Sequence, residues 1–461
     1  MAPGSDEPVA PAPPERIGLR THPLTGLVQG GIWAAAVVVG LVSSTLSGDG
    51  WGNIPIWLTL VIAVVGGLLV GEALGFLTWW FTRYVIDGTE LRINSGMLTK
   101  SSRRIPYERI QSVDIAEPLL ARLAGLAELR IEMAGGKNSR SSLRFLPLAE
   151  ARALRRLLLD RAHGRTGEVH DESSEPPEEQ RELIAVVSPE RVIIGTLLSL
   201  DFLFAILALV VVLVASIWFQ QVIAFLGGLF ALGSWIAQIV GKRVLQQWGF
   251  TLSRDSRGLR IERGLLSRTS QTIPFDRVQG VAVEEPYVWR RLGWQRLEVD
   301  VAGYATASDD NTTSTSSTLL PIADAQMAAY VLEQLVPGAR PDDIERVAVP
   351  SRGWWFAPIG WRYRWIGSDD HAFVARSGWL QRTTDVVPHH KTQSVAMRQG
   401  PLQRMRRVAT LDVHTPKGPV DADGRHLDEA DARRELFEQL ERARAARFGE
   451  STTTRRPPAG G

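Results

Sequence analysis

The hydrophobic positions of the chain gather into four long runs, and the segments between them alternate apolar and polar residues. The runs are Leu27–Leu46, Ile54–Phe81, Val192–Phe219 and Val222–Val240. Each is at least nineteen residues long, and the only charges inside them are Glu72 and Asp201. A helix needs about 20 mostly apolar residues to cross the hydrocarbon of a bilayer. The pattern therefore predicts four transmembrane helices in two hairpins, over residues 27–81 and 192–240.

Lys and Arg residues near the ends of the runs predict their orientation, because cytoplasmic flanks carry an excess of both. Arg16 and Arg20 precede the first run, and Lys242 and Arg243 follow the last. The two short connections inside the hairpins contain no Lys or Arg. We therefore expect an inner-membrane protein with both termini and all other segments in the cytoplasm.

An internal repeat is the most specific feature of the remaining sequence. Three segments that begin at Leu91, Leu259 and Phe373 align without gaps, and the first two share sixteen identities over forty-one positions. The shared motif residues are Gly96, Gly264 and Gly378, then Pro106, Pro274 and Pro388, then Gln111, Gln279 and Gln393. A repeat of this length indicates one small folding unit used three times.

Within each copy the pattern is that of short strands followed by a helix. Alternating stretches such as Leu129–Met133 are typical of half-buried strands. The shared Gly predicts a hairpin turn, the shared Pro the opening of the next strand, and the shared Gln a structural bond to the backbone. Closing helices are predicted at Leu148–Arg161, Ile322–Val336 and Leu427–Ala445. The fold class is therefore α+β with membrane helices, in which each repeat is a small β-sheet or partial barrel closed by a C-terminal helix.

The expected organisation follows the chain in order. It comprises a disordered tail 1–20, the first hairpin 27–81, repeat one 82–163, an acidic linker 164–182, the second hairpin 192–240, repeat two 241–337, repeat three 346–448 and a disordered tail 449–461.

The span pairs, the Gly turn, the Pro-to-Gln stretch and the closing helix resemble the bacterial pleckstrin-homology-like (PH-like) family, and within it the YdbT-like multi-span membrane proteins. The resemblance covers roughly residues 20 to 445, and repeat three departs from it because no apolar pair precedes that repeat. It implies a protein that acts with a smaller membrane protein bearing one copy of the domain, in envelope stress or tolerance of antimicrobial agents.

Composition narrows the chemistry further. There is no Cys, and the formal net charge is only +2, which is unlike a nucleic-acid-binding polycation. His389 and His390 are neighbours on a predicted strand and point to opposite faces, so they are poor joint metal ligands. No phosphate loop, nucleophile elbow or dinucleotide motif is present. We expect a protein that is not an enzyme and needs no cofactor, metal or nucleic acid.

Two sets of residues remain as functional candidates. Ionisable groups inside membrane runs often mark ion pathways, so Glu72 and Asp201 allow a transporter or channel component as an alternative function. The favoured interpretation is that each acid lies near the cytoplasmic interface or forms a structural hydrogen bond between the two hairpins. The second set lies in repeat three, where an aromatic stretch with Trp354 and Trp355 replaces the apolar pair and Arg404, Arg406 and Arg407 cluster nearby in sequence. The stretch suits either the headgroup layer of a bilayer or a packed linker strand.

The main functional hypothesis is a membrane scaffold whose repeats bind a protein partner, each other or the inner leaflet. The expected partners are the lipid bilayer, a single-repeat PH-like membrane protein and a second copy of the chain. Small-residue spacing around Gly66–Gly71 is compatible with such self-association.

Overall fold

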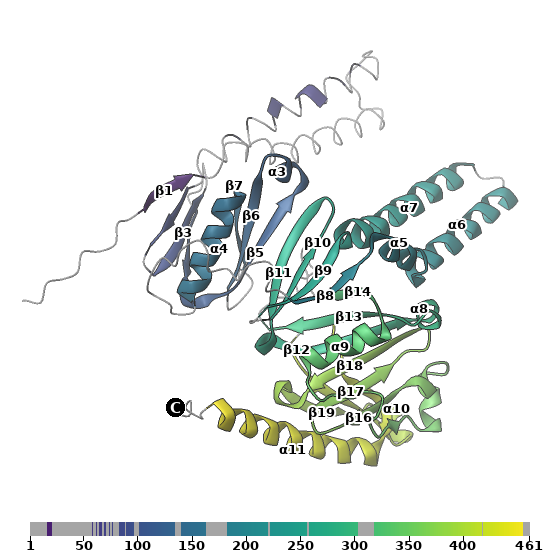
Figure 1. Cartoon of the computed structure of the whole chain (residues 1–461). Coiled ribbons are helices and arrows are strands. Elements are labelled where there is room, and N and C mark those ends of the chain that lie inside the picture. Colours follow the sequence, from purple (N-terminus) through teal and green to yellow (C-terminus); the bar gives the residue numbers. More distant parts are fainter. Residues whose placement is uncertain are drawn as a thin grey trace, which may run out of the picture. The chain divides into compact units, whose positions relative to one another are not determined.

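A computed structural model of the chain shows two compact units, Met1–Asp171 and Glu172–Gly461 (Figure 1). Besides scattered helical positions between 58 and 76, it describes residues 16–20, 83–87, 89–95, 101–133, 140–162, 182–219, 222–255, 258–302, 318–416 and 418–454.

The prediction of four transmembrane helices is wrong. In the part of the chain that the structure describes, no single helix is both long enough and apolar enough to cross a membrane. The run Val192–Phe219 is divided between α5 (Pro189–Leu197) and α6 (Leu200–Phe219), and this pair, bent by 48°, meets the two requirements only when taken together. Of the first two runs, Leu27–Leu46 lies outside the described residues, and Ile54–Phe81 is described only at scattered positions.

A serine breaks the apolar run. The Ser199 hydroxyl donates to the Thr196 carbonyl oxygen at 2.7 Å and accepts from the Phe202 amide at 3.4 Å, so one side chain ends α5 and begins α6. Hydropathy alone treats Ser199 as a tolerable interruption, because it measures composition and not hydrogen bonding.

The helix α5 belongs to repeat two and not to a membrane span. Its Val192 is buried in the core of that repeat, and the buried Trp289 indole donates to the Gly195 carbonyl oxygen at 3.0 Å. Ser188 caps the helix by accepting from the Arg191 amide. The apolar residues of α5 are therefore explained in part by packing against the repeat.

Repeat one consists of two antiparallel sheets closed by a helix. Its elements are β1 (Arg16–Arg20), β2 (Arg83–Ile86), β3 (Glu90–Ser95), β4 (Ser101–Pro106), η1 (Tyr107–Arg109), β5 (Ile110–Pro118), α3 (Leu119–Leu123), β6 (Leu126–Met133), β7 (Arg140–Pro147) and α4 (Leu148–Ala162). Strands β1 to β4 pair in order, as do β5 to β7. Leu91, Ile105, Leu129 and Leu158, from both sheets and α4, are fully buried and form the core.

Repeat two has the same order of strands. Its elements are β8 (Glu182–Val187), α5, α6, α7 (Val222–Val240), the π-helix η3 (Gly241–Leu245), β9 (Phe250–Asp255), β10 (Gly258–Arg263), β11 (Ser267–Pro274), η4 (Phe275–Arg277), β12 (Val278–Pro286), α8 (Tyr287–Arg291), β13 (Trp294–Val301), β14 (Thr318–Asp324) and α9 (Ala325–Leu335). Strand β8 pairs with β9 across the helices between them, just as β1 pairs with β2. Each apolar segment thus lies between strands one and two of a repeat, and the repeats begin earlier than residues 82 and 241.

Repeat three comprises β15 (Val347–Ala348), η5 (Ser351–Trp355), η6 (Trp361–Tyr363), β16 (Trp365–Ser368), β17 (Ala372–Ser377), β18 (Gln381–Pro388), η7 (His389–Lys391), β19 (Ser394–Arg398), α10 (Pro401–Met405), β20 (Val408–His414), β21 (Asp423–Asp428) and α11 (Glu429–Thr454). Strand β15 pairs with β16. The aromatic stretch therefore occupies, between strands one and two, the place that apolar helices occupy in repeat two.

Repeats two and three share one seven-stranded sheet, ordered β14-β13-β12-β18-β17-β16-β15. Strand β12 pairs antiparallel with β18, with Val281 opposite Val386 and Ala282 opposite Asp385. Val281 and Val386 lie in the core of repeat two, whereas Ala282 lies in the core of repeat three. Because the sheet has a hydrophobic core on each face, repeats two and three form one body.

Candidate functional site

The buried histidine of repeat three is structural. His389 Nε2 lies 2.8 Å from the Asp369 carbonyl oxygen, and desolvation lowers the pKa of the ring. Within the described residues, no group of three or more histidine, aspartate or glutamate side chains is placed to hold a metal ion.

The repeat motif residues shape the turns around each strand four. Gly264 and Gly378 have φ of +112° and +91° in the hairpins before β11 and β18, and a Cβ there would collide with the carbonyl oxygens of Ser267 and Gln381. Gly96 lies outside the described residues.

The motif prolines end a strand, whereas the sequence pattern predicts that each of them opens one. Pro106, Pro274 and Pro388 are the last residues of β4, β11 and β18, and each precedes a 3-10 turn. That position suits a residue without an amide hydrogen, because the strand pairing stops there.

The motif glutamines differ from one another. Gln279 is half-buried and donates to the Arg277 carbonyl oxygen at 3.1 Å, whereas Gln393 is exposed. The side chain of Gln111 lies outside the description.

The two candidate segments of repeat three meet in space. The Arg406 guanidinium lies 4.4 Å from the centroid of the Trp355 ring, and Trp354 packs edge-on against Trp355 at 5.8 Å. This contact joins η5 to the residues that follow α10. We call the set Trp354, Trp355, Leu402, Arg404, Met405, Arg406 and Arg407 the aromatic–basic surface.

A half-buried link of three side chains connects the two parts of this surface. Phe356, which follows η5, stacks on His426 of β21 with ring centroids 4.6 Å apart. Gln403 of α10 donates to His426 Nδ1 at 3.1 Å, and its Oε1 accepts from the Gly400 amide. Desolvation, then Arg364 and Arg425, lower the pKa of His426, which keeps Nδ1 free to accept.

The aromatic–basic surface contains large apolar side chains that are exposed to solvent. Side chains of Trp355, Leu402 and Met405 are exposed by 64%, 67% and 80%. An exposed apolar group of this kind marks an interaction site more often than a solvated face.

Backbone strain is concentrated at the same place. Among the described residues, the non-glycine residues with positive φ are Arg407 at 50° and His426 at 64°. Arg407 aligns with Gly125 and Gly293, whose φ values are 67° and 68°. A non-glycine residue in this region costs about 1–2 kcal/mol. Repeat three therefore carries an arginine where the other two repeats carry the residue best suited to the backbone, and such strain is concentrated at functional sites.

The arginines of the surface differ in their pairing from several other arginines of repeat three. Arg376, Arg382, Arg398 and Arg425 each form an ion pair with a carboxylate. No ion pair found among the described residues includes Arg404, Arg406 or Arg407. Three positive charges thus stand next to one another without a carboxylate partner in the described part of the chain.

Of the two acids in the apolar runs, Asp201 forms an ion pair with Arg243 of η3 at the base of the α6–α7 hairpin. Glu72 lies outside the described residues. The ion pair gives Asp201 a structural role, because it ties the start of α6 to the segment that follows α7.

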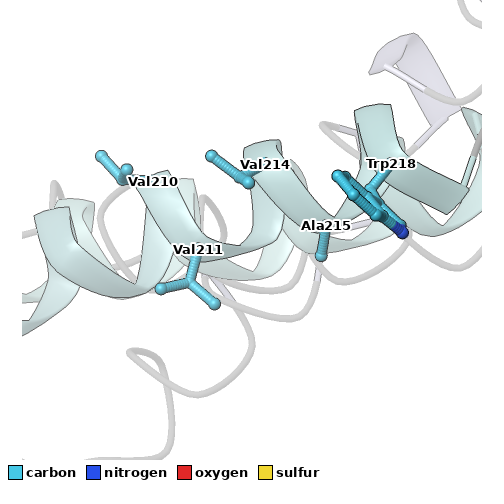
Figure 2. Close-up of a pocket in the computed structure, with 5 residues that line it drawn as sticks. All are labelled: Val210, Val211, Val214, Ala215 and Trp218. Carbon is cyan, nitrogen blue, oxygen red and sulfur yellow. The ribbon is translucent and has the colours of Figure 1, made fainter.

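The outer surface of α6 is apolar along its length. Val210, Val211, Val214, Ala215 and Trp218 line an open hollow (Figure 2), and Trp218 is largely exposed. The hollow contains no charged group, so it is suited to apolar contact and not to catalysis.

Part of this site could be read from the sequence and part could not. The Trp and Arg residues were identified, but Phe356, Gln403 and His426, which connect them, were not. The substitution of Arg407 for the aligned glycine was visible in the repeat alignment and indicated the strain.

Comparison with known proteins defines the class of the protein. The family model for the bacterial PH domain matches residues 33–162, 193–336 and 335–444, and the chain belongs to this family. The resemblance inferred from the repeat motifs is therefore confirmed.

Among named relatives, the chain is similar to the UPF0699 transmembrane protein YdbT of Bacillus subtilis (strain 168), with 25% identity over 260 residues. The match covers 50% of this chain and 52% of the relative, so the chain spans about half the length of that protein.

Proposed function

We propose that this protein is a membrane-associated interaction scaffold without enzymatic activity. The observation that carries the proposal is the sheet shared by repeats two and three, which joins two small domains into one body. Membership of the bacterial PH domain family and similarity to a protein named as transmembrane support it.

The membrane association is supported by the exposed apolar side chains of α6, which are suited to contact with lipid. By the distribution of Lys and Arg, the repeats face the cytoplasm at the inner membrane of a bacterial cell. We include a role in envelope stress in the proposal, because the repeat motifs resemble those of YdbT-like proteins.

The partner is a protein that adds a strand to β19. Strand β12, the equivalent of β19 in repeat two, pairs on one side with β13 and on the other with β18. Strand β19 pairs only with β20 within the described sheets. Val281 and Ala282 of β12 are buried, whereas the aligned Val395 and Ala396 are half-buried. An unpaired edge of this kind accepts an extended segment by backbone hydrogen bonds, and a single-repeat PH-like protein or a second copy could supply it.

Site-specific photo-crosslinking in membranes tests this function. A crosslinking residue at Ser394, which is exposed on β19, should capture one defined protein reproducibly in the membrane fraction. The matched control is Phe437 on α11, exposed on the same repeat. Recovery of the chain in the soluble fraction, or the same captures from both positions, would contradict the proposal.

The transporter alternative is tested by replacing Glu72→Gln and Asp201→Asn together. A scaffold should retain its crosslinked partner in the double variant. A proton-coupled transporter should lose its activity, since the carboxylates would be the titrating groups.

A further inference from the structure

We propose that the aromatic–basic surface of repeat three docks onto the headgroup layer of an anionic phospholipid bilayer. Arg404, Arg406 and Arg407 would contact lipid phosphates, while Trp354, Trp355, Leu402 and Met405 enter the interfacial region. The proposal deepens the proposed function and rests on the membrane association stated there.

The first argument is the position of the surface within its repeat. In repeat two the segment between strands one and two forms the apolar helices α6 and α7. In repeat three the same connection, from β15 to β16, contains η5 with Trp354 and Trp355. Equivalent connections leave equivalent repeats at the same place. The connection that is most apolar in one repeat is aromatic in the other, and Trp is enriched at membrane–water interfaces.

The second argument is the chemistry of the exposed groups. Leu402 and Met405 on α10 and Trp355 on η5 are exposed. The three arginines of the surface lie within two residues of Met405 in the sequence. Exposed apolar groups with adjacent cations are typical of segments that lie in a bilayer interface. The cations lack carboxylate partners among the described residues, so they are available to lipid phosphates, whose geometry the guanidinium fork matches.

The third argument is the strained backbone at Arg407. Glycine at this position serves repeats one and two, and φ of Gly293 is 68° against 50° for Arg407. A Cβ at Gly293 or Gly125 would have no atom within 4 Å, so crowding does not decide the residue. The arginine of repeat three is therefore explained by its charge and not by its backbone.

The test uses the full chain, which contains no cysteine to compete for a thiol label. An environment-sensitive fluorophore is attached at Met405→Cys, and the protein is reconstituted into phosphatidylcholine vesicles with or without phosphatidylglycerol. The matched control is Leu123→Cys, because Leu123 holds the aligned position of repeat one and is exposed by 78% against 80% for Met405.

The expected result at position 405 is a blue-shifted emission, quenched by lipid-borne spin labels, only when phosphatidylglycerol is present. The effect should fall as NaCl rises from ~0.1 to ~1 M, because the screening length shortens from ~10 to ~3 Å. Position 123 should report water in both lipids.

The variant Arg407→Gly separates charge from folding, since it restores the residue of the other repeats and should not destabilise the protein. It is expected to weaken docking about fivefold, the effect of one basic residue near an anionic surface, while Arg407→Lys should retain docking. Equal emission at position 405 in both lipids at low salt would overturn the proposal, as would unchanged docking in Arg404→Ser, Arg406→Ser and Arg407→Gly combined.

Failure of this inference is distinguishable from failure of the proposed function. If the chain does not remain with the vesicles, the membrane association itself is wrong. If it remains with them while position 405 reports water in both lipids, only the lipid contact is wrong, and a protein partner for the surface is favoured.

Discussion

The junction between repeats two and three should loosen as pH rises, because two carboxyl groups are buried there. Asp385 of β18 lies opposite Ala282 of β12, and Asp300 lies on β13. Desolvation raises the pKa of Asp385 to about 8, with Asp421, Asp423 and Glu284 adding to the effect and the Asp421 amide opposing it. Desolvation likewise raises the pKa of Asp300 to about 7, with Glu298 adding to it and the Val420 amide opposing it.

Both carboxyl groups are covered by the loop between β20 and β21. A Cβ at Gly418 of this loop would collide with Asp300, and one at Gly280 of β12 would lie 3.1 Å from Val420. Opening the junction would lift the loop from the shared sheet and return both groups to water. The two pKa values would then fall toward the ordinary value of 3.8.

The sign follows from proton binding. Between pH 3.8 and the raised pKa, the closed junction holds protons that the open junction releases. The free energy of opening therefore decreases by about 1.4 kcal/mol per pH unit for each group, and the loss is complete above its raised pKa. From pH 6 to 8 we expect a loss of about 2 kcal/mol from Asp385 and about 1 kcal/mol from Asp300.

Hydrogen exchange with mass spectrometry, corrected for the intrinsic pH dependence of exchange, measures this opening in peptides from β12 and β18. Asp385→Asn removes one titrating group and keeps the side-chain shape, so its loss from pH 6 to 8 should be only about 1 kcal/mol. Peptides from β6 in repeat one serve as the internal control. An equal loss in Asp385→Asn and the unsubstituted protein, or protection that rises with pH, would refute the buried protonated carboxyl.

Four further substitutions test packing and backbone conformation, each by thermal or chemical unfolding of the full chain. Arg407→Gly should stabilise repeat three by about 1 kcal/mol, because glycine adopts a positive φ without strain. Gly293→Ala should destabilise repeat two by about as much, because it places a Cβ at a positive φ. A change of the same sign in both variants would contradict the inference that Arg407 is strained. Trp289→Phe should cost about 1–2 kcal/mol by leaving the buried Gly195 carbonyl without its donor, and unchanged hydrogen exchange in α5 would show that α5 is held otherwise. Gln279→Leu should cost no more than about 1 kcal/mol, since its bond to Arg277 is local and half-buried; a larger loss would indicate a contact beyond that bond.

The repeat was predictable because its features are local in sequence. Gly264 and Gly378 mark turns that need a positive φ, and the closing helices follow from the spacing of apolar residues. Hydropathy predicted transmembrane helices wrongly, because the same apolar composition serves lipid contact and core packing. Val192 illustrates this, since it is buried against repeat two, and Ser199 bends the run through hydrogen bonds that composition does not contain.

The shared sheet needed the structure, because it depends on pairing between residues about a hundred positions apart. The strands that take part in the shared sheet nevertheless differ in sequence from the equivalent strands of repeat one. Val374 and Val386 of repeat three align with Arg92 and Arg104 of repeat one. In repeat three both valines are buried under repeat two, and strands buried on both faces lose their alternation. In repeat one Arg104 is exposed and Arg92 pairs with Asp87 and Glu90, which leaves a polar face.

The closing helices α9 and α11 also differ, at the positions that would face the strands of a following repeat. Val331 and Leu335 of α9 lie in the core that covers β17 and β18. Counted from the aspartate before each helix, the aligned residues of α11 are Glu435 and Gln439, and Gln439 is buried and donates to Thr392 of its own repeat. A helix with these polar residues would leave them unsatisfied against another apolar sheet face, which is costly. The order of the repeats is therefore encoded by a few face positions, since α9 is built to receive a following repeat whereas α11 is built to close its own.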